Sequence, residues 1–329
     1  MIISKTPFRI SFFGGGTDHP SWYENNGGSV LSVTINKYCY ISCRPLNPFF
    51  SHNYRIVYSK TEAVNSISEI RHPGVRAVLR YFDVKQNLEI HHDADLPAKS
   101  GMGSSSSYIV GLINVMLRFL KIRMNKLEIG KLAIEIEQNK MKECVGSQDQ
   151  IAAAVGGFNK IEFKKNNEIN VSPFPITDNN IQILEDNLLL FFTNQQRVAS
   201  KIEQKKVKNF KDKNKEMNFL NQSVEHGIEL LNKKNFDLKD FGELLHENWL
   251  RKKSLHNSVS DNVFDLAYNT ALKNGALGGK ILGAGGGGFM ILLVEKERQK
   301  KIINLLDPYV NVSFKFEDGG TKNYAINET

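Results

Sequence analysis

"LPAKSGMGSSSSYIVGLINVML", Leu96 to Leu117, places two glycines and four consecutive serines directly before an apolar segment with helical spacing. A turn followed by a serine N-cap would explain only one of these serines. Gly101 and Gly103 allow neighbouring backbone N–H groups to face one concavity. A helix that begins there adds unpaired N–H groups and the positive end of its dipole. The stretch therefore predicts a phosphate-binding loop whose serine hydroxyls complete the site.

Length and composition favour a globular protein of two domains. The chain has 329 residues, of which 41% are hydrophobic and 24% are charged, as in ordinary globular proteins. No segment approaches the roughly 18 uncharged apolar residues of a membrane span. The N-terminal sequence lacks a small-residue cleavage site and continues directly into a strand pattern. We therefore expect a cytoplasmic protein without a membrane partner, whose three cysteines match no zinc site and stay reduced.

The formal net charge of +8 raises the question of a nucleic-acid partner. Seven lysines between Lys201 and Lys215 supply much of this charge, but they are mixed with acidic residues, as on a solvated surface helix. No basic motif interleaved with aromatic residues appears. We therefore expect no nucleic-acid partner. The charge favours an anionic small substrate, which the field in a cleft would attract.

The order of strand and helix patterns indicates an α+β protein. Residues 1–60, "NLEIHHDADL" and the end of "IAAAVGGFNKIEF" carry strand patterns. Apolar periodicity predicts helices at "GVRAVLRYF", "SSSYIVGLINVMLRFLKI" and "KLEIGKLAIEIEQNKM", and from Gln195 to about Lys273. We expect "VNVSFKF" to be the last strand. The domain boundary is expected near Asp186, which gives domains of residues 1–185 and 186–329.

Two more stretches concentrate glycine at the ends of predicted elements. They are "PFRISFFGGGTDHP", Pro7 to Pro20, and "GGKILGAGGGGF", Gly278 to Phe289. A single loop of this kind is weak support for a site, since glycine also serves ordinary tight turns. Three of them in one chain indicate that the backbone approaches a ligand closely at several places.

These stretches resemble the motifs of the GHMP kinases, the family of galactokinase, homoserine kinase and mevalonate kinase. "PAKSGMGSSSS" is similar to the family loop P-x-x-x-G-L-G-S-S-A-A, with Met102 in place of Leu and Ser106 and Ser107 in place of two alanines. "PFRISFFGGGTDHP" resembles the first family motif, "GSQDQIAAAVGG" the catalytic segment, and "KILGAGGGGF" the third motif. The four motifs follow in the family order and cover the whole chain.

The resemblance implies a two-domain α+β GHMP kinase fold. Its N-terminal domain should contain a left-handed β-α-β crossover, against the general right-handed preference. Its C-terminal domain should be a ferredoxin-like α+β layer. The nucleotide and the sugar should then bind in the cleft between the two domains.

Within the family, "FFGGGTDHP" together with "GSQDQ" is most similar to the heptose-phosphate kinases. Gly15 and Gly16 replace the Glu-His pair of the galactokinases, which argues against galactose and favours a bulkier sugar phosphate. The resemblance thus implies transfer of the γ-phosphoryl of ATP to the anomeric hydroxyl of a heptose 7-phosphate. A kinase of a free sugar such as fucose or galactose and a non-catalytic sugar sensor are the alternatives. The sequence leaves the oligomeric state open, a homodimer included.

The resemblance also implies the residues of the reaction. Asp149 should act on the attacking hydroxyl as a base or an orienting group, although its place before an apolar helix also suits an N-cap. Arg9 should pair with Asp149 and meet the transferring phosphoryl group, and a structural ion pair is compatible with that role. The expected ATP-binding residues are Pro97, Lys99, Ser100, Gly101, Met102, Gly103, Ser104, Ser105 and Ser106.

For Mg²⁺, the resemblance implies Ser105 and Glu137 as ligands, with Glu135 as the fallback. For the sugar, it implies contacts from "GGGTD", "GSQDQ" and the third glycine loop. The expected residues are Gly15, Gly16, Thr17, Asp18, Gln150, Gly285 and Gly286. Arg197 and Lys201 share a helix face and are expected to bind the sugar's own phosphate, with Arg44 and Arg71 as weaker rivals.

Overall fold

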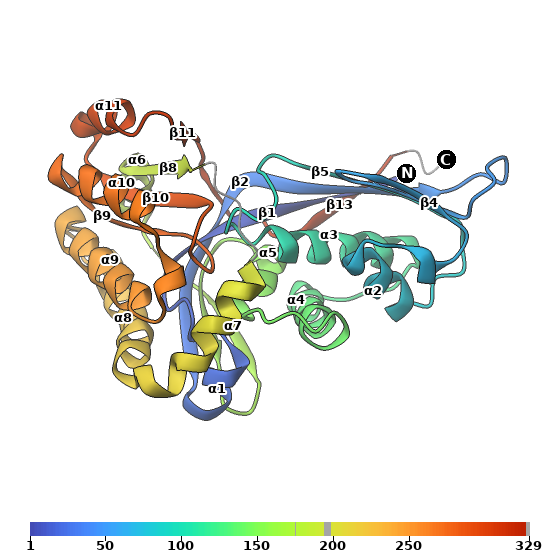
Figure 1. The fold of residues 1–329 in the computed structure, drawn as a ribbon, viewed down its shortest axis with the longest axis horizontal. Coiled ribbons are helices and arrows are strands. Elements are labelled where there is room, and N and C mark those ends of the chain that lie inside the picture. The colour runs from blue at the N-terminus through green and yellow to red at the C-terminus, as the bar shows by residue number, and fades with distance from the viewer. Residues whose placement is uncertain (175, 194–198, 327–329) are drawn as a thin grey trace.

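The computed structural model describes residues 1–174, 176–193 and 199–326. Two lobes are visible, each built on a β-sheet with helices beside it (Figure 1). The larger sheet has the order β13-β1-β2-β5-β3-β4, and β12 and β6 also pair with β2 while β7 pairs with β6. Its strands are β1 (Ile2–Phe13), β2 (Gly28–Pro45), β3 (Tyr54–Val57), β4 (Thr61–Val64), β5 (Leu88–Ala94), β6 (Phe158–Phe163), β7 (Ile169–Pro173), β12 (Phe316–Glu317) and β13 (Lys322–Ala325).

Helix α3 (Ser104–Phe119) forms the centre of the first lobe, below the larger sheet (Figure 1). Its residues from Ser106 to Leu117 are all buried, because the helix packs on β1 and β2 and also contacts neighbouring helices. At Gly111 a Cβ atom would stand 2.9 Å from Oγ1 of Thr6. A small residue therefore sets the close approach of α3 to β1. The other helices of this lobe are α1 (Pro20–Asn26), α2 (Pro73–Tyr81), α4 (Lys126–Glu135) and α5 (Gln148–Val155).

The second lobe is an antiparallel sheet of order β11-β8-β10-β9 with helices packed beside it. Gly278 of β9 lies against Gly242 of α9, where a Cβ atom would stand 2.1 Å from the Gly242 carbonyl oxygen, so this helix packs closely on the sheet. The strands are β8 (Leu188–Phe192), β9 (Ala276–Ile281), β10 (Phe289–Val294) and β11 (Val310–Asn311). The helices from residue 178 onward are α6 (Asp178–Asp186), α7 (Ala199–Asn209), α8 (Asn214–Asn232), α9 (Leu238–Lys253), α10 (Asn262–Lys273) and α11 (Lys296–Leu305).

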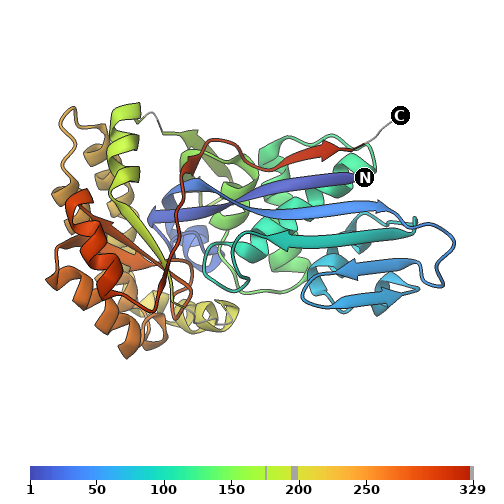
Figure 2. The same cartoon turned by 90° about the horizontal axis from the view of Figure 1, so that it is seen from above.

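The two-domain α+β fold expected from the sequence is confirmed, with one difference at the C-terminus. The second sheet begins with β8, directly after α6 ends at Asp186. "VNVSFKF" is not one last strand: β11 pairs with β8, whereas β12 and β13 return to β2 and β1 of the first sheet. Figure 2 shows the red C-terminal strand beside the N-terminal strand. The C-terminal strands join the first sheet because they pair with strands far away in the sequence. The local pattern of residue types does not reveal such a pairing.

Two further details differ from or extend the expectations. The segment predicted as one helix, "KLEIGKLAIEIEQNKM", is α4 followed by a π-helical turn over Ile136–Lys140. Strands β3 and β5 are parallel, with α2 in the connection between them. The left-handed crossover stays a prediction.

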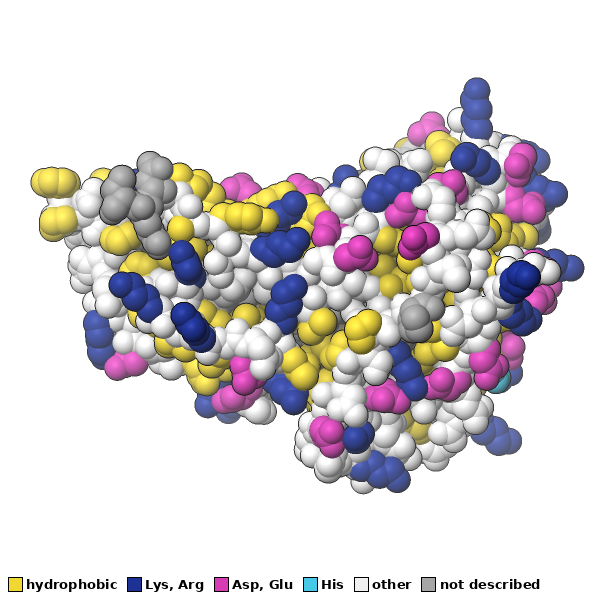
Figure 3. Space-filling view, turned by 180° about the vertical axis from the view of Figure 1, so that it is seen from behind, with side chains coloured by type: hydrophobic (Ala, Val, Ile, Leu, Met, Phe, Trp, Pro, Cys, Tyr) yellow, Lys and Arg dark blue, Asp and Glu magenta, His cyan; other side chains and the backbone are white. Residues whose placement is uncertain are grey.

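The surface carries charges of both signs. Figure 3 shows Lys and Arg side chains interspersed with Asp and Glu across the rear face. No helix in the described part of the chain is long and apolar enough to cross a membrane. The three cysteines are free thiols, with Cys39 and Cys43 buried and Cys144 half-buried.

Candidate active site

A cavity of about 260 Å³ lies between the lobes. The first lobe contributes β1, the loop before α3 and the first turn of α5 to its wall. The second lobe contributes α9, β9 and the glycine-rich loop after β9, and α7 lies between the lobes in Figure 1. The three glycine-bearing stretches thus meet at one cavity, although they lie far apart in the sequence.

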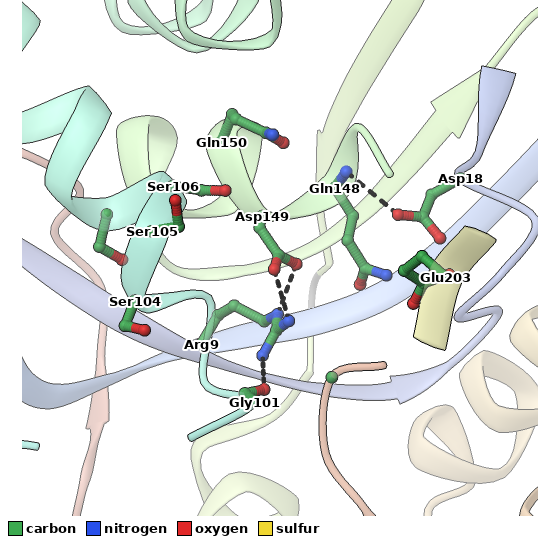
Figure 4. A network of polar contacts seen from close by, with 12 residues as sticks. Arg9, Asp18, Gly101, Ser104, Ser105, Ser106, Gln148, Asp149, Gln150 and Glu203 are labelled. Atoms are coloured by element: carbon green, nitrogen blue, oxygen red, sulfur yellow. Dashed lines mark hydrogen bonds and ion pairs between the residues drawn. The ribbon is translucent and has the colours of Figure 1, made fainter. Parts of the chain in front are cut away.

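Arg9 and Asp149 form a two-point ion pair in this cavity (Figure 4). Nε of Arg9 donates to Oδ1 of Asp149 at 2.8 Å, and Nη2 donates to Oδ2 at 2.7 Å. Nη1 of Arg9 donates to the carbonyl oxygen of Gly101 at 2.9 Å. Burial raises the pKa of Asp149, and the Arg9 guanidinium opposes this rise. Since Ser147 occupies the N-cap of α5 and both oxygens of Asp149 accept from Arg9, Asp149 is not a helix cap.

The loop before α3 has the features expected of an anion site. Its helix begins at Ser104 after Gly103, which is left-handed with φ 76°, and no side chain in the described part of the chain caps the helix. The first N–H groups of α3 therefore have no side-chain acceptor. Of the expected ATP-binding residues, six line the cavity: Lys99, Gly101, Gly103, Ser104, Ser105 and Ser106.

The other three expected ATP-binding residues do not line the cavity, and two of them support the loop from behind. Met102 is fully buried, and its carbonyl oxygen accepts from the backbone N–H of Arg9. The carbonyl oxygen of Ser100 accepts from the N–H of Phe289, which ties the loop to β10. Pro97 is absent from the described lining of the cavity.

Glu137 lies behind the serines and is fully buried. Its two oxygens accept from Ser105 at 2.9 Å, from Ser106 at 2.7 Å and from Gln150 at 2.6 Å. Burial raises the pKa of Glu137 to about 6 in spite of these three donors. Glu135, the fallback for the metal, instead pairs with Lys140 at 3.5 Å with both side chains about half exposed.

The expected sugar-binding residues divide into two groups. Gly15, Gly16 and Asp18 line the cavity. The structure does not bring Thr17 or Gln150 to it, because Oγ1 of Thr17 donates to the carbonyls of Gly14 and Ser29 and Gln150 points to Glu137. Gln148 takes the place on the cavity wall that the sequence had suggested for Gln150 (Figure 4).

The third glycine loop lines the cavity through residues that precede the two expected ones in the sequence. Gly283 and Ala284 line it, whereas Gly285 and Gly286 are not among the lining residues and instead contact Val259. Gly283 and Gly101 lie against each other: a Cβ atom on Gly283 would stand 2.6 Å from the carbonyl oxygen of Gly101. The second and third glycine loops therefore support one another.

The two side chains expected to bind the sugar's phosphate lie outside what the structure describes. Arg197 lies outside the described residues, and Lys201 is in α7 but its side chain is not described. Neither rival, Arg44 or Arg71, lines the cavity; Arg44 forms an ion pair with Glu89.

Sequence reasoning missed five charged residues of the cavity wall. Lys206 was interpreted as part of a solvated face but is 1% exposed. Ile202, four residues earlier in α7, and Phe210, four residues later in the 3-10 turn that follows α7, are also buried. This spacing of four residues was a usable signal. A lysine inside the glycine and apolar run "GGKIL" was a second signal. The five residues are Glu143, Glu203, Lys206, Lys252 and Lys280.

Comparison with known proteins places the sequence and the fold in one family. The GHMP kinases N terminal domain matches residues 70–157, and the GHMP kinases C terminal domain matches residues 228–307. The chain is 31% identical to D-glycero-alpha-D-manno-heptose 7-phosphate kinase from Campylobacter jejuni, with 99% of each chain covered. It is 25% identical to a bifunctional fucokinase/GDP-fucose pyrophosphorylase from Arabidopsis thaliana, over 94% of this chain and 32% of that protein.

Solved structures of kinases share the fold of this chain. The fold is similar to that of a D-glycero-D-manno-heptose 1-phosphate kinase from Bacteriodes thetaiotaomicron, with a TM-score of 0.82, 26% identity and 100% of both chains covered. A mevalonate kinase at 19% identity shares the fold with a TM-score of 0.71, over 96% of this chain and 99% of that one. Because the motifs, both matched domains and a full-length relative agree, the chain belongs to the GHMP kinase family, among its ATP-dependent sugar kinases.

Proposed function

We propose that the protein transfers the γ-phosphoryl group of ATP to the anomeric hydroxyl of D-glycero-D-manno-heptose 7-phosphate. The product would be the 1,7-bisphosphate, formed in the cytoplasm on the route to nucleotide-activated heptose and surface polysaccharide. The observation that carries this proposal is the Arg9–Asp149 pair, which shares one cavity with the glycine and serine loop. The full-length relative from C. jejuni supports the choice of sugar.

In this proposal Asp149 acts on the attacking hydroxyl and Arg9 on the phosphoryl group. A pKa raised by burial makes the Asp149 carboxylate a better proton acceptor than an exposed aspartate. Arg9 fixes both oxygens of Asp149 and also bonds the loop at Gly101. Its guanidinium therefore lies between the base and the phosphate loop, where it stabilises the negative charge that develops during transfer.

Ser105 and Glu137 have the donor chemistry that Mg²⁺ requires. Mg²⁺ takes oxygen ligands and usually only one or two of them from protein. Glu137 is a fully buried carboxylate that lies behind Ser105, and Ser105 lines the cavity. A bound Mg²⁺ would neutralise charge on the nucleotide phosphates. The raised pKa of Glu137, which burial causes, is what a buried anion shows before a cation offsets it.

Specific observations favour two alternative substrates, a different heptose phosphate and a free sugar. The two heptose kinases named above differ in the phosphate that their names give, position 7 in one and position 1 in the other. The similarity to a fucokinase supports a free sugar. The presence of Arg9, Asp149 and the uncapped helix in one cavity argues against a non-catalytic sensor.

The test is an ATP-consumption assay with the purified protein across heptose 7-phosphate, heptose 1-phosphate, free heptose, fucose and galactose. The proposal expects the highest kcat/KM with heptose 7-phosphate and a product with a second phosphate on C1 by ³¹P NMR. A higher kcat/KM with a free sugar, or phosphorylation at another position, would overturn it. Asp149→Asn serves as the inactive control.

A further inference from the structure

Three buried lysines from the second half of the chain converge on the cavity. They are Lys206 of α7, Lys252 of α9 and Lys280 of β9, and their exposed fractions are 1%, 3% and 1%. All three line the cavity. We call them the three-lysine cluster. Lysine is seldom fully buried unless it is paired, so three in one wall are a built feature of the site.

Two members of the three-lysine cluster lack an anionic partner among the described residues. Lys206 pairs with Glu203 at 2.7 Å. Lys252 donates to the carbonyl oxygens of Ile281 and Gly283, and Lys280 donates to the carbonyl of Phe12 at 2.7 Å and to Asn248. Two ammonium groups are therefore held by neutral oxygens beside an open cavity. Burial, together with the nearby Lys206 ammonium, lowers the pKa of Lys252 to about 7, and a bound anion would oppose this shift.

The three-lysine cluster lines the same cavity as the carboxylates of Asp18 and Glu203. The Lys252 ammonium is within electrostatic range of Asp18 and Glu203, and Lys206 pairs with Glu203 directly. The first lobe carries the groups suited to nucleotide phosphates. These are the uncapped start of α3, Lys99 and the serines. Because Asp18 and Glu203 can accept from sugar hydroxyls, we take an anion bound beside them to be one that the sugar carries.

We propose that the three-lysine cluster binds the phosphate group that the sugar substrate already carries before transfer. This inference rests on the proposed function. It gives the three-lysine cluster the role that the sequence suggests for Arg197 and Lys201, whose side chains lie outside the described residues. It makes the cluster the determinant that separates a sugar phosphate from a free sugar. The rival source of the same chemistry is the terminal phosphoryl group of the nucleotide, because Gly283, which accepts from Lys252, lies against Gly101 of the phosphate loop.

The test compares Lys206→Met and Lys252→Met with wild type on D-glycero-D-manno-heptose 7-phosphate, on unphosphorylated heptose and on ATP. Loss of one charged contact should lower kcat/KM for the sugar phosphate by about 10- to 100-fold. The same variants should change kcat/KM for free heptose and KM for ATP by less than about 3-fold. Lys205→Met on α7 and Arg251→Met on α9 are the matched controls, since both side chains are exposed neighbours on the same helices.

Each outcome decides the question. Equal losses on both sugars overturn the inference, and a loss that appears in KM for ATP assigns the cluster to the nucleotide and also overturns it. Lys206→Arg, which keeps the charge, should retain more affinity for the sugar phosphate than Lys206→Met. The two methionine variants lie on different helices, so a folding failure in one, detected by thermal unfolding, leaves the other as the test. If wild type does not phosphorylate any sugar phosphate, the wild-type data alone show that the proposed function has failed and this inference with it.

Discussion

Gly103 lies against the carboxylate of Asp149: a Cβ atom on Gly103 would stand 3.3 Å from Oδ2 of Asp149. Gly103 also has a φ of 76°, which a residue with a side chain adopts only at a cost. This glycine therefore does two things. It lets the chain turn into α3, and it leaves room for Asp149 to face the cavity.

Gly103→Ala should impair transfer more than it impairs folding. The added methyl group displaces Asp149 from Arg9, so kcat should fall by about 10- to 100-fold. Steady-state kinetics and calorimetric ATP binding check this result. Gly27→Ala is the control, because Gly27 has a similar φ of 75° but a Cβ atom there meets nothing closer than 3.7 Å. Equal kinetics in the two variants would show that Gly103 serves only the turn.

Asp149→Asn should keep the fold and ATP binding while kcat falls by roughly 10²- to 10⁴-fold. Asparagine has nearly the same shape but accepts no proton and offers Arg9 one oxygen in place of two. Rapid-quench single-turnover measurements separate the chemical step from product release. Near-normal turnover would reduce Asp149 to the ion-pair partner of Arg9.

Arg9→Lys should lower kcat/KM by about 10- to 100-fold. A lysine ammonium cannot reach both oxygens of Asp149 and the carbonyl of Gly101 in the way the planar guanidinium does. A thermal unfolding scan belongs beside the kinetics, because Arg9 is buried and any substitution perturbs its surroundings. Unchanged kinetics with a lowered melting temperature would make the pair structural.

The sequence identified residues whose role depends on local backbone. Gly101 and Gly103 could be assigned because they stand with four serines before a helix and match a family motif. The ion pair of Arg9 and Asp149 followed from the same family resemblance. The direction in which a side chain points from its helix was harder to predict. Neighbouring residues of a helix are separated by about 100°, so Asp149 faces the cavity while Gln150 faces Glu137.

Contacts between segments that are distant in the sequence could not be predicted from local sequence patterns. The return of β13 to β1 and the meeting of Gly101 with Gly283 depend on where whole elements pack. Lys206 illustrates the same limit, since a lysine in a charged helix is usually solvated. Only the buried residues four positions away on either side, Ile202 and Phe210, marked it as different.

Lys252→Met should change how stability depends on pH. Burial holds the pKa of Lys252 at about 7 in the folded protein, against 10.5 for an ordinary lysine in the unfolded chain. Between these two values the unfolded chain binds the proton and the folded protein does not. Wild type should therefore gain stability relative to the variant as pH rises from 7 toward 10.5, by roughly 1.4 kcal/mol per pH unit at most. Below pH 7 the difference should be constant, because Lys252 is charged in both states.

Urea unfolding at pH 6, 7, 8 and 9 without substrate measures this difference in stability, and Lys205→Met corrects for the change in net charge. A pH-independent difference across the series would mean that Lys252 stays charged in the free protein, with its ammonium already matched by an anion.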